Sequence, residues 1–368
     1  MNDENKIRIL YINGGTMDFG GISSYMMNYY RQFDKSKIQV DFIVHGEGGV
    51  YDQEIEKMGG IIYHIPTKRE NLLGNIFAML SIMKKGNYHI VHSHMDGMNG
   101  LVLKMAKQCR VVSRISHSHN TEHLTTNCIK EKIHEYLRKR IVKYATEFWA
   151  CSDNAGRWLY GENTLFEVIP NAIDAMKYSF DERKRREVRK RLKLEDKYVI
   201  GHIGRFDYQK NHTFLLSVFA KLVQSREDAI LVLVGDGDLR KSIEAQIIRL
   251  GIEENVLLLG TRDDVAELMN AFDLFVLPSK FEGLGIVVVE AQANGLPCIC
   301  SNQVPREVNI TDNVIFLDLT QEQAWVEALM KTRKRKKDVY TDICKAGYEI
   351  KLTAELLQEK YASLISVS

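Results

Sequence analysis

Short apolar runs rich in β-branched residues alternate with longer amphipathic segments along the chain, and this alternation constrains the fold more than any other feature. We predict strands near 7–13, 38–45, 60–65, 89–94, 111–117, 147–151, 166–169, 198–204, 229–235, 256–260, 274–278, 297–301 and 314–317. The amphipathic segments predict helices at 22–33, 70–85, 128–145, 211–225, 238–250 and 321–336. Such alternation is typical of parallel sheets covered by helices on both faces. The sequence therefore predicts an α/β protein with doubly wound, Rossmann-like sheets.

The chain is long enough for two such domains, because 368 residues exceed the roughly 100–200 residues of a usual domain. We place the boundary after Pro170-Asn171-Ala172, since a highly charged stretch at 181–191 precedes the next strand pattern at Tyr198. The predicted domains are 1–172 and 173–349. The last segment, about 338–368, reads as helix, and its part from about 350 is a candidate to pack back on the first domain.

The composition argues against several classes of protein. A net charge of +2 provides no global field that would recruit nucleic acid. The N-terminus MNDENKIRIL lacks the basic start and apolar stretch of a secretory signal, and no window approaches the roughly 18 apolar residues of a spanning helix. The six cysteines form no paired CxxC, which favours reduced thiols over disulfides or zinc ligands. A cytoplasmic protein is expected.

A glycine-rich loop follows the first predicted strand, from Asn13 to Gly21, and leads into a helix. Glycines there, including Gly20 and Gly21, let the backbone approach a ligand, and a helix start favours anions. The spacing differs from the GxGxxG fingerprint, so a Rossmann dehydrogenase is disfavoured. A flexible turn without a ligand is the alternative interpretation.

Four histidines end two consecutive strand patterns in the first half: His92 and His94 in VHSHMD, and His117 and His119 in RISHSHN. Alternate residues of a strand share a face, so each pair could chelate a metal. Carboxylates that usually complete a metal site are sparse, with Asp96 the one close by. We favour a histidine that handles substrate over a metal site, and plain structural histidines remain an alternative.

Two loops in the second half combine charge with glycine. In GRFDYQKNH (204–212), Arg205 can fork onto a phosphate and Lys210 adds a mobile charge near a helix start. In PSKFEGLGI (278–286), Glu282 lies in the turn after a buried strand, and Glu290 lies in the following helix. This loop offers carboxylates for sugar hydroxyls and free amides for phosphate. Solvated charges in polar turns are the alternative.

Two runs are strongly basic, 331–337 and 183–191. The first reads as a solvated helix face, and contact with an anionic membrane surface is the alternative. The second has the same two interpretations, but its interspersed acids Glu182 and Glu187 weaken the membrane interpretation.

Taken together, these loops resemble the retaining glycosyltransferases of family 4, which have the GT-B fold of two Rossmann-like domains facing each other across a cleft. The resemblance is carried by GRFDYQKNH (204–212), VGDGDLR (234–240), LPSKFEGLGIVVVEAQANGLP (277–297), PNAID (170–174), GGISSYM (20–26) and SHSHN (116–120). Its most specific part is a pair of glutamates with seven residues between them, Glu282 and Glu290. The stretch SNQVPREVN (301–309) departs from the glycine-rich form often seen after the last donor-site strand.

The resemblance implies a role for each residue of the second half. Arg205 and Lys210 resemble the pair that neutralises the donor diphosphate. Glu282 resembles the residue beside the transferred sugar, and Glu290 resembles the ribose-binding glutamate. Donor contacts are also implied for the helix start at Gly283, Leu284 and Gly285.

The first half contributes Gly20 and Gly21, which resemble the loop that closes over the phosphates, and His117, which resembles a histidine close to the reacting sugar. His119 is a second candidate, because SHSHN leaves the register ambiguous by one histidine pair. The further candidate site residues are Asn120, Asn171, Arg262 and Glu307.

The implied activity is retaining, metal-independent transfer of a hexose from a nucleotide sugar, with UDP expected from family frequency and without a cofactor. The implied acceptor is a glycan or a lipid-linked sugar in bacterial polysaccharide, exopolysaccharide or capsule synthesis, with peripheral contact at the inner face of the membrane as an alternative to a fully cytoplasmic location. A nucleotide-sugar epimerase of the same fold and a non-catalytic sugar-nucleotide-binding subunit are the competing interpretations.

Overall fold

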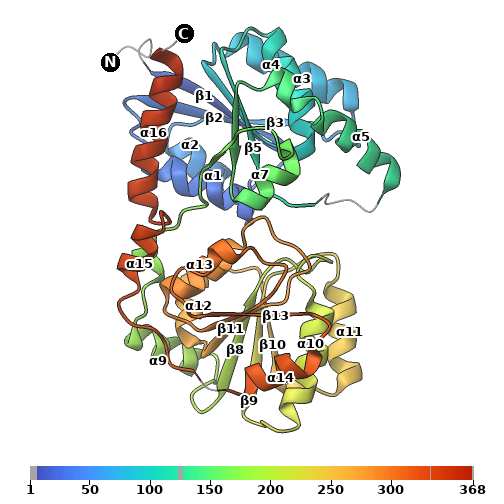
Figure 1. The fold of residues 1–368 in the computed structure, drawn as a ribbon, viewed down its shortest axis with the longest axis vertical. Coiled ribbons are helices and arrows are strands. Elements are labelled where there is room, and N and C mark those ends of the chain that lie inside the picture. The colour runs from blue at the N-terminus through green and yellow to red at the C-terminus, as the bar shows by residue number, and fades with distance from the viewer. Residues whose placement is uncertain (1–5, 123–126, 332, 367–368) are drawn as a thin grey trace. The chain divides into compact units, whose positions relative to one another are not determined.

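The computed structural model of this protein describes residues 6–122, 127–331 and 333–366, and the chain divides into two compact units (Figure 1). Unit 1 comprises the chain up to Ala172 together with the segment from Ile350 onward, and unit 2 comprises Ile173–Glu349. The C-terminal segment thus leaves unit 2 and completes unit 1.

Unit 1 contains a seven-stranded parallel sheet in the order β3-β2-β1-β4-β5-β6-β7. Its strands are β1 (Ile7–Asn13), β2 (Ile38–His45), β3 (Ile62–Ile65), β4 (Ile90–His94), β5 (Ser113–Ser118), β6 (Glu147–Ala150) and β7 (Glu167–Val168). The strand order reverses between β1 and β4, where Tyr11 lies level with His92. Ligands of open α/β sheets bind beyond the carboxyl ends of the strands at such a point.

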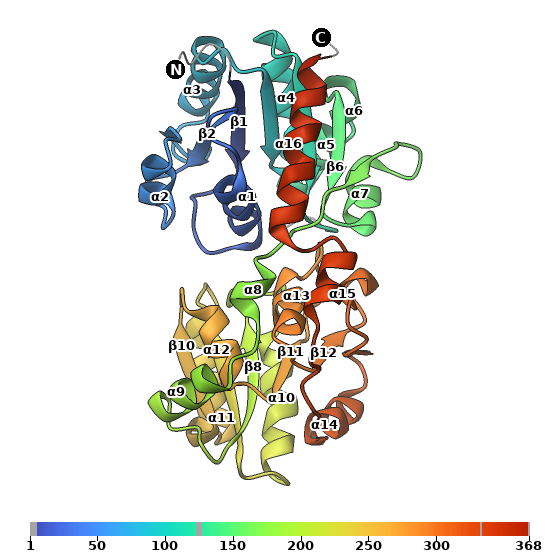
Figure 2. The ribbon, with the colours of Figure 1, turned by 90° about the vertical axis from the view of Figure 1, so that its left-hand side faces the viewer.

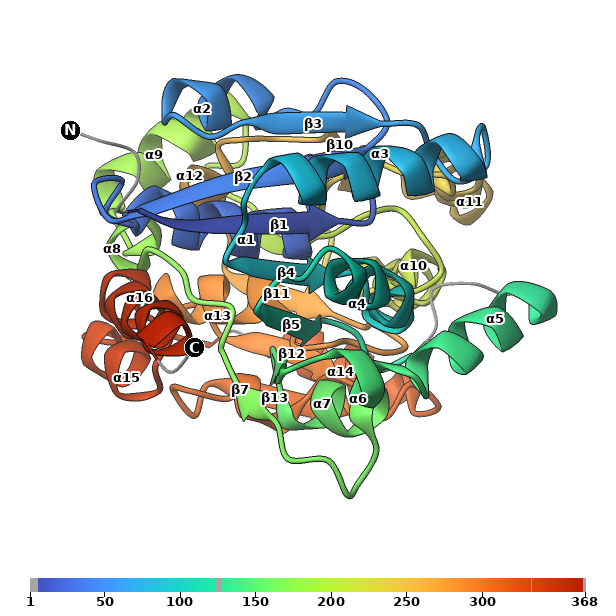
Figure 3. The same ribbon diagram turned by 90° about the horizontal axis from the view of Figure 1, so that it is seen from above.

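Helices cover both faces of this sheet, and the side chains of its central strands are accordingly buried on both sides. The helices are α1 (Gly21–Gln32), α2 (Asp52–Lys57), α3 (Leu72–Lys85), α4 (Asn99–Gln108), α5 (Cys128–Arg138), α6 (Ile141–Tyr144), α7 (Asp153–Tyr160) and α16 (Ile350–Ser366), with a 3-10 turn η2 (Asp96–Met98). Helices α1 and α16 pack on one face, and α3 and α4 pack on the other (Figures 2 and 3).

Unit 2 repeats the design with a six-stranded parallel sheet in the order β10-β9-β8-β11-β12-β13. Its strands are β8 (Tyr198–Ile203), β9 (Ala229–Val234), β10 (Val256–Gly260), β11 (Leu274–Leu277), β12 (Cys298–Ser301) and β13 (Val314–Leu317). Its helices are α8 (Ala175–Tyr178), α9 (Glu182–Arg191), α10 (His212–Val223), α11 (Arg240–Leu250), α12 (Val265–Ala271), α13 (Ile286–Ala293), α14 (Glu322–Met330) and α15 (Tyr340–Lys345), with 3-10 turns η3 (Glu253–Asn255) and η4 (Arg306–Val308). The order reverses between β8 and β11.

Every predicted strand has a counterpart in the structure, and the predicted doubly wound sheets are confirmed. Several helix predictions were wrong in extent. The segment 128–145 forms two helices, α5 and α6, and the C-terminal segment also forms two, α15 and α16. The predicted helix 321–336 ends at Met330, because the basic run that follows is drawn into contacts described next.

The basic run 331–337 is not the predicted helix face, and its Thr332 lies outside the described residues. Arg335 instead donates to the carbonyl oxygens of Met269, Asn270 and Phe272 at 3.1, 3.1 and 2.6 Å, at the end of α12. A helix end leaves carbonyl oxygens without intrahelical partners and carries partial negative charge, so a guanidinium stabilises it. Most of the other side chains in the run are exposed.

The second basic run also contributes to this end of α12. From α9, Arg185 donates to the Phe272 carbonyl at 2.9 Å, and Arg189 donates to the Ala271 carbonyl at 2.9 Å. Both arginines also pair with Asp273, at 2.5 and 3.2 Å. Arginines from both basic runs therefore hold one helix terminus inside unit 2.

Candidate functional site

Two loops meet at the carboxyl ends of β8 and β11, where the strand order of unit 2 reverses. The Lys280 N–H donates to the Gln209 carbonyl at 2.8 Å, and the Asn211 side-chain amide donates to the Pro278 carbonyl at 3.1 Å. These bonds tie the loop after β8 to the loop after β11. They bring together the predicted residues Lys210 and Glu282, which lie 72 positions apart in the sequence.

Lys210 and Glu282 form an ion pair with 2.6 Å between Nζ and Oε1. Glu282 is buried and also accepts hydrogen bonds from Ser279 Oγ at 2.6 Å and from Gln209 Nε2 at 3.3 Å. A buried carboxylate needs such partners, because removing its hydration without replacement is costly. Neither Ser279 nor Gln209 was predicted to be a partner of Glu282. Ser279 stands three positions before Glu282, which is the one signal in the sequence.

The stem of Lys210 lies across Gly204. A Cβ placed on Gly204 would come within 3.1 Å of Lys210 Cγ and Cδ, so a larger residue would displace the lysine. Glycine at this position therefore serves the close approach of a side chain rather than a special backbone conformation.

Arg205 extends into solvent, with 65% of its side chain exposed. Its Nε donates to Asp207 Oδ2 at 2.7 Å, and the other oxygen of Asp207 accepts the Lys210 backbone N–H at 3.0 Å. Asp207, which the sequence analysis did not single out, thus positions both predicted cations. The guanidinium keeps its Nη donors available for an anion.

Helix α13 begins at Ile286, directly after the loop that carries Glu282. Gly285 adopts the left-handed region with φ +85°, which a larger residue would reach only with strain. A Cβ there would lie 3.4 Å from Leu277 and from Val304. No side chain caps this helix start among the described residues, so its first amides remain donors for an anion. Gly283 and Leu284 are buried beside it.

Glu290 lies in the second turn of α13, half-buried, and hydrogen-bonds the side chain of Tyr178 on α8. Burial raises the pKa of Glu290 from its ordinary value of 4.5 to about 7, although Tyr178 and Lys177 oppose this shift. Near neutral pH the protonated and ionised forms of this carboxyl group are therefore both populated.

We expect donor binding to depend on pH through Glu290. If the ionised carboxylate accepts the ribose hydroxyls, the apparent affinity for a nucleoside diphosphate will fall up to about tenfold per pH unit below pH 7. Isothermal titration of UDP between about pH 5.5 and 8.5 will measure this dependence. In Glu290→Gln the dependence should disappear, and an unchanged pH profile in that variant would contradict the assigned role.

The same shift has a consequence for stability. A carboxyl group whose pKa is raised by folding stabilises the fold below its unfolded pKa, and this contribution is lost as pH rises through the folded value. The melting temperature of Glu290→Gln relative to the wild type should therefore rise between about pH 4.5 and 7. This measurement needs no ligand, so it tests the pKa separately from the role.

In unit 1 the four predicted histidines do come together, on and after the adjacent strands β4 and β5, and all four are buried. His92 Nε2 lies 3.0 Å from His117 Nδ1, and His94 Nδ1 lies 2.8 Å from His119 Nε2. Burial is the main cause that lowers the pKa of each ring, that of His119 to about 3. The cluster is therefore neutral at physiological pH.

The histidine cluster also fastens α16 to the sheet of unit 1. Tyr361 OH lies 2.8 Å from His92 Nδ1 and 2.8 Å from Tyr11 OH. His92, His94 and His117 have nitrogen atoms within 4.8 Å of one another, a spacing from which a metal ion could gather them. His92 Nε2 and His117 Nδ1 are already in contact with each other, and several rings are stacked. A structural role is thus evident for His92, while His94, His117 and His119 each retain one ring nitrogen without a partner among the described residues.

The neighbouring loop of unit 1 is held by Asp96. This carboxylate accepts hydrogen bonds from the backbone N–H of His119 at 2.8 Å and from the side-chain amide of Asn120 at 2.6 Å. Gly20 and Gly21 stand exposed at the start of α1, where a Cβ would meet no heavy atom within 4 Å among the described residues. Nothing in their surroundings requires glycine, which leaves backbone approach to a ligand as the predicted reason.

The remaining candidates are more dispersed. Asn171 is buried in unit 1, whereas Arg262 and Glu307 belong to unit 2. Arg262 follows β10 and forks onto Asp264, with both N–O distances at 2.8 Å. Glu307 is exposed on η4. The local geometry therefore gives Arg262 a partner of its own.

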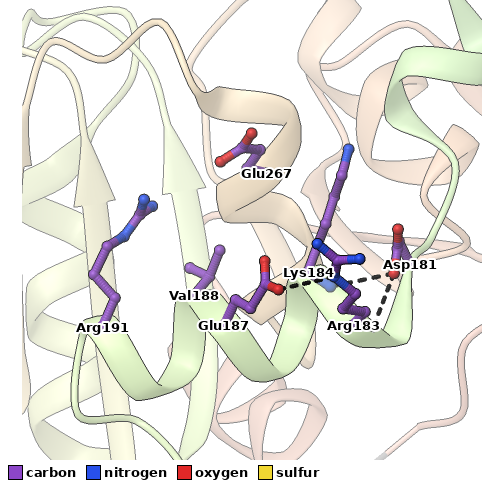
Figure 4. A pocket seen from close by; sticks show the side chains of 7 residues that line it. All are labelled: Asp181, Arg183, Lys184, Glu187, Val188, Arg191 and Glu267. Atoms are coloured by element: carbon purple, nitrogen blue, oxygen red, sulfur yellow. Dashed lines mark hydrogen bonds and ion pairs between the residues drawn. The ribbon is translucent and has the colours of Figure 1, made fainter.

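A hollow of about 380 Å³ lies elsewhere in unit 2, between α9 and α12 (Figure 4). It is lined by Asp181, Arg183, Lys184, Glu187, Val188, Arg191 and Glu267. Within this hollow, Arg183 Nε pairs with Glu187 at 2.9 Å. It contains none of the predicted site residues and offers no grouping of catalytic character.

Comparison with known proteins identifies the class. The family described as "Glycosyltransferase Family 4" matches residues 19–177, and the family "Glycosyl transferases group 1" matches residues 184–349. The two matches together include every strand except β1, and the second contains the Lys210–Glu282 loops. The chain belongs to the glycosyltransferases of the GT-B, family 4 type, as the resemblance in the sequence implied.

Individual relatives fit this assignment. The glycosyltransferase named EpsF of Bacillus subtilis (strain 168) is 33% identical over 98% of this chain and 97% of its own. The UDP-Gal:alpha-D-GlcNAc-diphosphoundecaprenol alpha-1,3-galactosyltransferase of Escherichia coli is 23% identical over 98% of each chain. The capsular polysaccharide biosynthesis glycosyltransferase CapH of Staphylococcus aureus is 26% identical over 86% of this chain and 88% of its own.

A solved structure shares the fold. The crystal structure of Anabaena Alr3699/HepE in complex with UDP and glucose has a TM-score of 0.73 and 18% identity, over 98% of this chain and 97% of that one. At this level of identity the similarity concerns the fold alone.

Proposed function

We propose that this glycosyltransferase transfers a sugar from a UDP-sugar to a lipid-linked or glycan acceptor in bacterial polysaccharide synthesis, with retention of anomeric configuration and without a metal or cofactor. The observation that carries the proposal is the Lys210–Glu282 ion pair beside the open start of α13, at the strand reversal of unit 2. Support for UDP and for lipid-linked acceptors comes from the names of the Escherichia coli and Anabaena proteins.

The site has the charge that this chemistry requires. Breaking the bond between the sugar and the phosphate builds negative charge on the leaving diphosphate, and fixed donors stabilise that charge without reorganisation. Arg205, Lys210 and the first amides of α13 would supply these donors. Glu282 keeps the Lys210 ammonium in place before the donor binds, and its carboxylate would then orient the sugar.

The proposed reaction is a front-face displacement. The bond between the anomeric carbon and the phosphate oxygen breaks, and the acceptor oxygen bonds to the same carbon on the same face. The acceptor proton passes to the leaving diphosphate oxygen, so the products are the glycosylated acceptor and UDP. A double displacement through a carboxylate would need a nucleophile on the opposite face of the sugar. Glu282 is engaged by three side chains, which suits orientation rather than attack.

With a lipid-linked acceptor, the enzyme would work at the cytoplasmic face of the membrane as a peripheral protein. No described helix is long and apolar enough to cross a bilayer. Contact with lipid would therefore have to come from the surface of one of the units.

Product analysis tests the proposal. We expect the full chain, incubated with a labelled UDP-sugar and a polyprenyl-diphosphate-linked sugar, to form a new glycosidic bond whose NMR coupling shows retention. The panel of donors can first be narrowed by melting temperature, because a ligand that binds the folded state raises it. Addition of EDTA should leave the rate unchanged.

Each other outcome points elsewhere. An epimerised donor without a new bond would identify an epimerase, and stabilisation by UDP-sugars without consumption would identify a binding subunit. An inverted product would contradict retention alone. Loss of activity in EDTA, restored by a divalent ion, would contradict metal independence and direct attention to His92, His94 and His117.

A further inference from the structure

Glu290 is held by a neutral hydrogen-bond donor, whereas Glu282 is held by a cation. The carboxyl group of Glu290 hydrogen-bonds the side chain of Tyr178 on α8, a helix that packs against α13 (Figure 2). Glu282, in contrast, pairs with the Lys210 ammonium at 2.6 Å. An ionised carboxylate can accept about four hydrogen bonds. One bond from a neutral hydroxyl therefore fixes the direction of Glu290 and leaves its charge and most of its acceptor positions for a ligand.

The charged groups around Glu290 lie on the helices that pack against α13. On α8, the exposed ammonium of Lys177 stands next to Tyr178 in the sequence. The other packed elements with charged side chains are α15 and η4, with Asp342, Lys345, Arg306 and Glu307. The shift in the pKa of Glu290 comes from burial, from Tyr178 and from Lys177. Burial opposes ionisation of this carboxyl group, so the two neighbours on α8 are the groups that favour it.

Helix α8 is short, and residues from distant parts of unit 2 hold it in place. At its start, the Ala175 N–H donates to Glu349 Oε2 at 3.1 Å, and Glu349 is buried. At its end, the side-chain amide of the buried Asn294 donates to the Tyr178 carbonyl at 2.8 Å. Asn294 is the C-cap of α13, so the helix that carries Glu290 also fixes the backbone of Tyr178. Isolated helices of this length are unstable in water, and these contacts keep the tyrosine hydroxyl at the carboxyl group.

We propose that Tyr178 is a positioning residue of the donor site, which orients Glu290 toward the ribose hydroxyls and leaves its carboxylate able to accept them. The inference rests on the proposed function, because it takes the donor to be a nucleoside diphosphate sugar. The tyrosine hydroxyl donates one hydrogen bond to the carboxylate, and the two adjacent ribose hydroxyls donate to its remaining acceptor positions. A cation in place of Tyr178 would bind the carboxylate more strongly and compete with these neutral donors.

The same hydrogen bond sets the pH range in which Glu290 can accept a ligand. Burial raises the pKa of Glu290 to about 7, and the Tyr178 hydroxyl opposes this rise because it stabilises the ionised form. Without the hydroxyl the pKa rises further, so more of the protein carries a protonated Glu290 at neutral pH. The protonated carboxyl group has lost its charge and part of its acceptor capacity, and the affinity for the ribose falls with it.

Tyr178→Phe in the full chain tests the proposal, because it removes only the hydroxyl. In isothermal titration of UDP between about pH 5.5 and 9, the midpoint of the pH dependence should move upward by about one pH unit, since ionised Glu290 loses a hydrogen bond. The affinity on the plateau above the midpoint should fall about five- to tenfold, since the carboxylate is no longer oriented. In steady-state kinetics at pH 7, KM for the donor should rise about tenfold and kcat should change less than about twofold, because the Lys210–Glu282 pair is untouched.

Two further variants separate orientation from charge and from stability. Lys177→Met removes the neighbouring charge and keeps the hydrogen bond, so it should move the midpoint upward and retain the wild-type plateau. Tyr88→Phe is the matched control, because the Tyr88 hydroxyl donates to the buried Asp41 at 2.8 Å in unit 1. This control should lower the melting temperature, as loss of a hydrogen bond to a buried carboxylate does, and leave UDP binding unchanged at every pH.

Two results would overturn the inference alone. A wild-type midpoint and plateau in Tyr178→Phe, together with a lower melting temperature, would assign the tyrosine to the fold. A shifted midpoint with a wild-type plateau would show that the hydroxyl affects ionisation without orienting the carboxylate. UDP binding that follows the expected pattern in a protein that forms no glycosidic bond would retain the inference and contradict the proposed transfer. A wild-type protein that binds no UDP at any pH would contradict both.

Discussion

Replacement of Lys210 by methionine, or of Glu282 by glutamine, is expected to lower kcat/KM by about 10²–10³-fold. The first change removes the ammonium proposed to stabilise the leaving diphosphate, and the second removes the carboxylate proposed to orient the sugar. Steady-state kinetics with the donor found in the panel measure the effect. The exposed Lys221, which pairs with Glu322 on the surface of unit 2, provides the control Lys221→Met with wild-type rates. Wild-type turnover in both Lys210→Met and Glu282→Gln would contradict the assignment of these two residues to the donor site.

The double variant Lys210→Met/Glu282→Gln separates catalysis from stability. Each single change leaves one partner of a nearly buried ion pair without its counter-charge, which lowers the melting temperature. The double variant leaves no unpaired charge, so its melting temperature should exceed that of either single variant. Its activity should remain as low as theirs. Recovery of activity together with stability would show that the pair serves the fold alone.

Arg335→Ala is expected to destabilise unit 2 by about 3 kcal/mol, because three carbonyl groups at the end of α12 lose a charged donor. For a domain of this size the melting temperature should fall by about 6–12 °C. Calorimetry or denaturant unfolding of the full chain measures the change. Burial lowers the pKa of Arg335 to about 9, yet the guanidinium remains charged at neutral pH.

Two variants make the Arg335 result specific. Lys334→Ala changes the adjacent exposed residue of the same run and should leave stability unchanged. Arg335→Lys should recover only part of the loss, because an ammonium cannot reproduce a planar fork that reaches several carbonyls. Equal stability of Arg335→Ala and the wild type would contradict this structural role and favour the interpretation of the run 331–337 as solvated surface.

The strands could be predicted from the sequence because a buried parallel strand is apolar on both faces and bounded by turn residues. The runs at β8 and β9, with almost every side chain buried, show this clearly. Helix ends were predicted less well. The helix predicted over 321–336 stops at Met330 because Arg335 is drawn to carbonyl oxygens of α12, more than 60 positions away, and no local pattern records such a partner.

The candidate site was predicted in part. Lys210 and Glu282 were singled out separately, and the structure brings them to 2.6 Å. Asp207, Ser279 and Gln209, which position them, were missed because short polar residues in loops are common and carry little signal. The four histidines were placed at the ends of two consecutive strand patterns, and the structure brings them together, but their burial and the contact with Tyr361 were not foreseen.

By itself the sequence determined the alternation of strand and helix, the two parallel sheets and the family to which the chain belongs, because periodicity and loop motifs are local properties. Only the tertiary structure decided what the charges do. It assigned Arg185, Arg189 and Arg335 to one helix terminus and paired Lys210 with Glu282. A charge acts through the partner that folding brings to it, and these partners lie far along the chain.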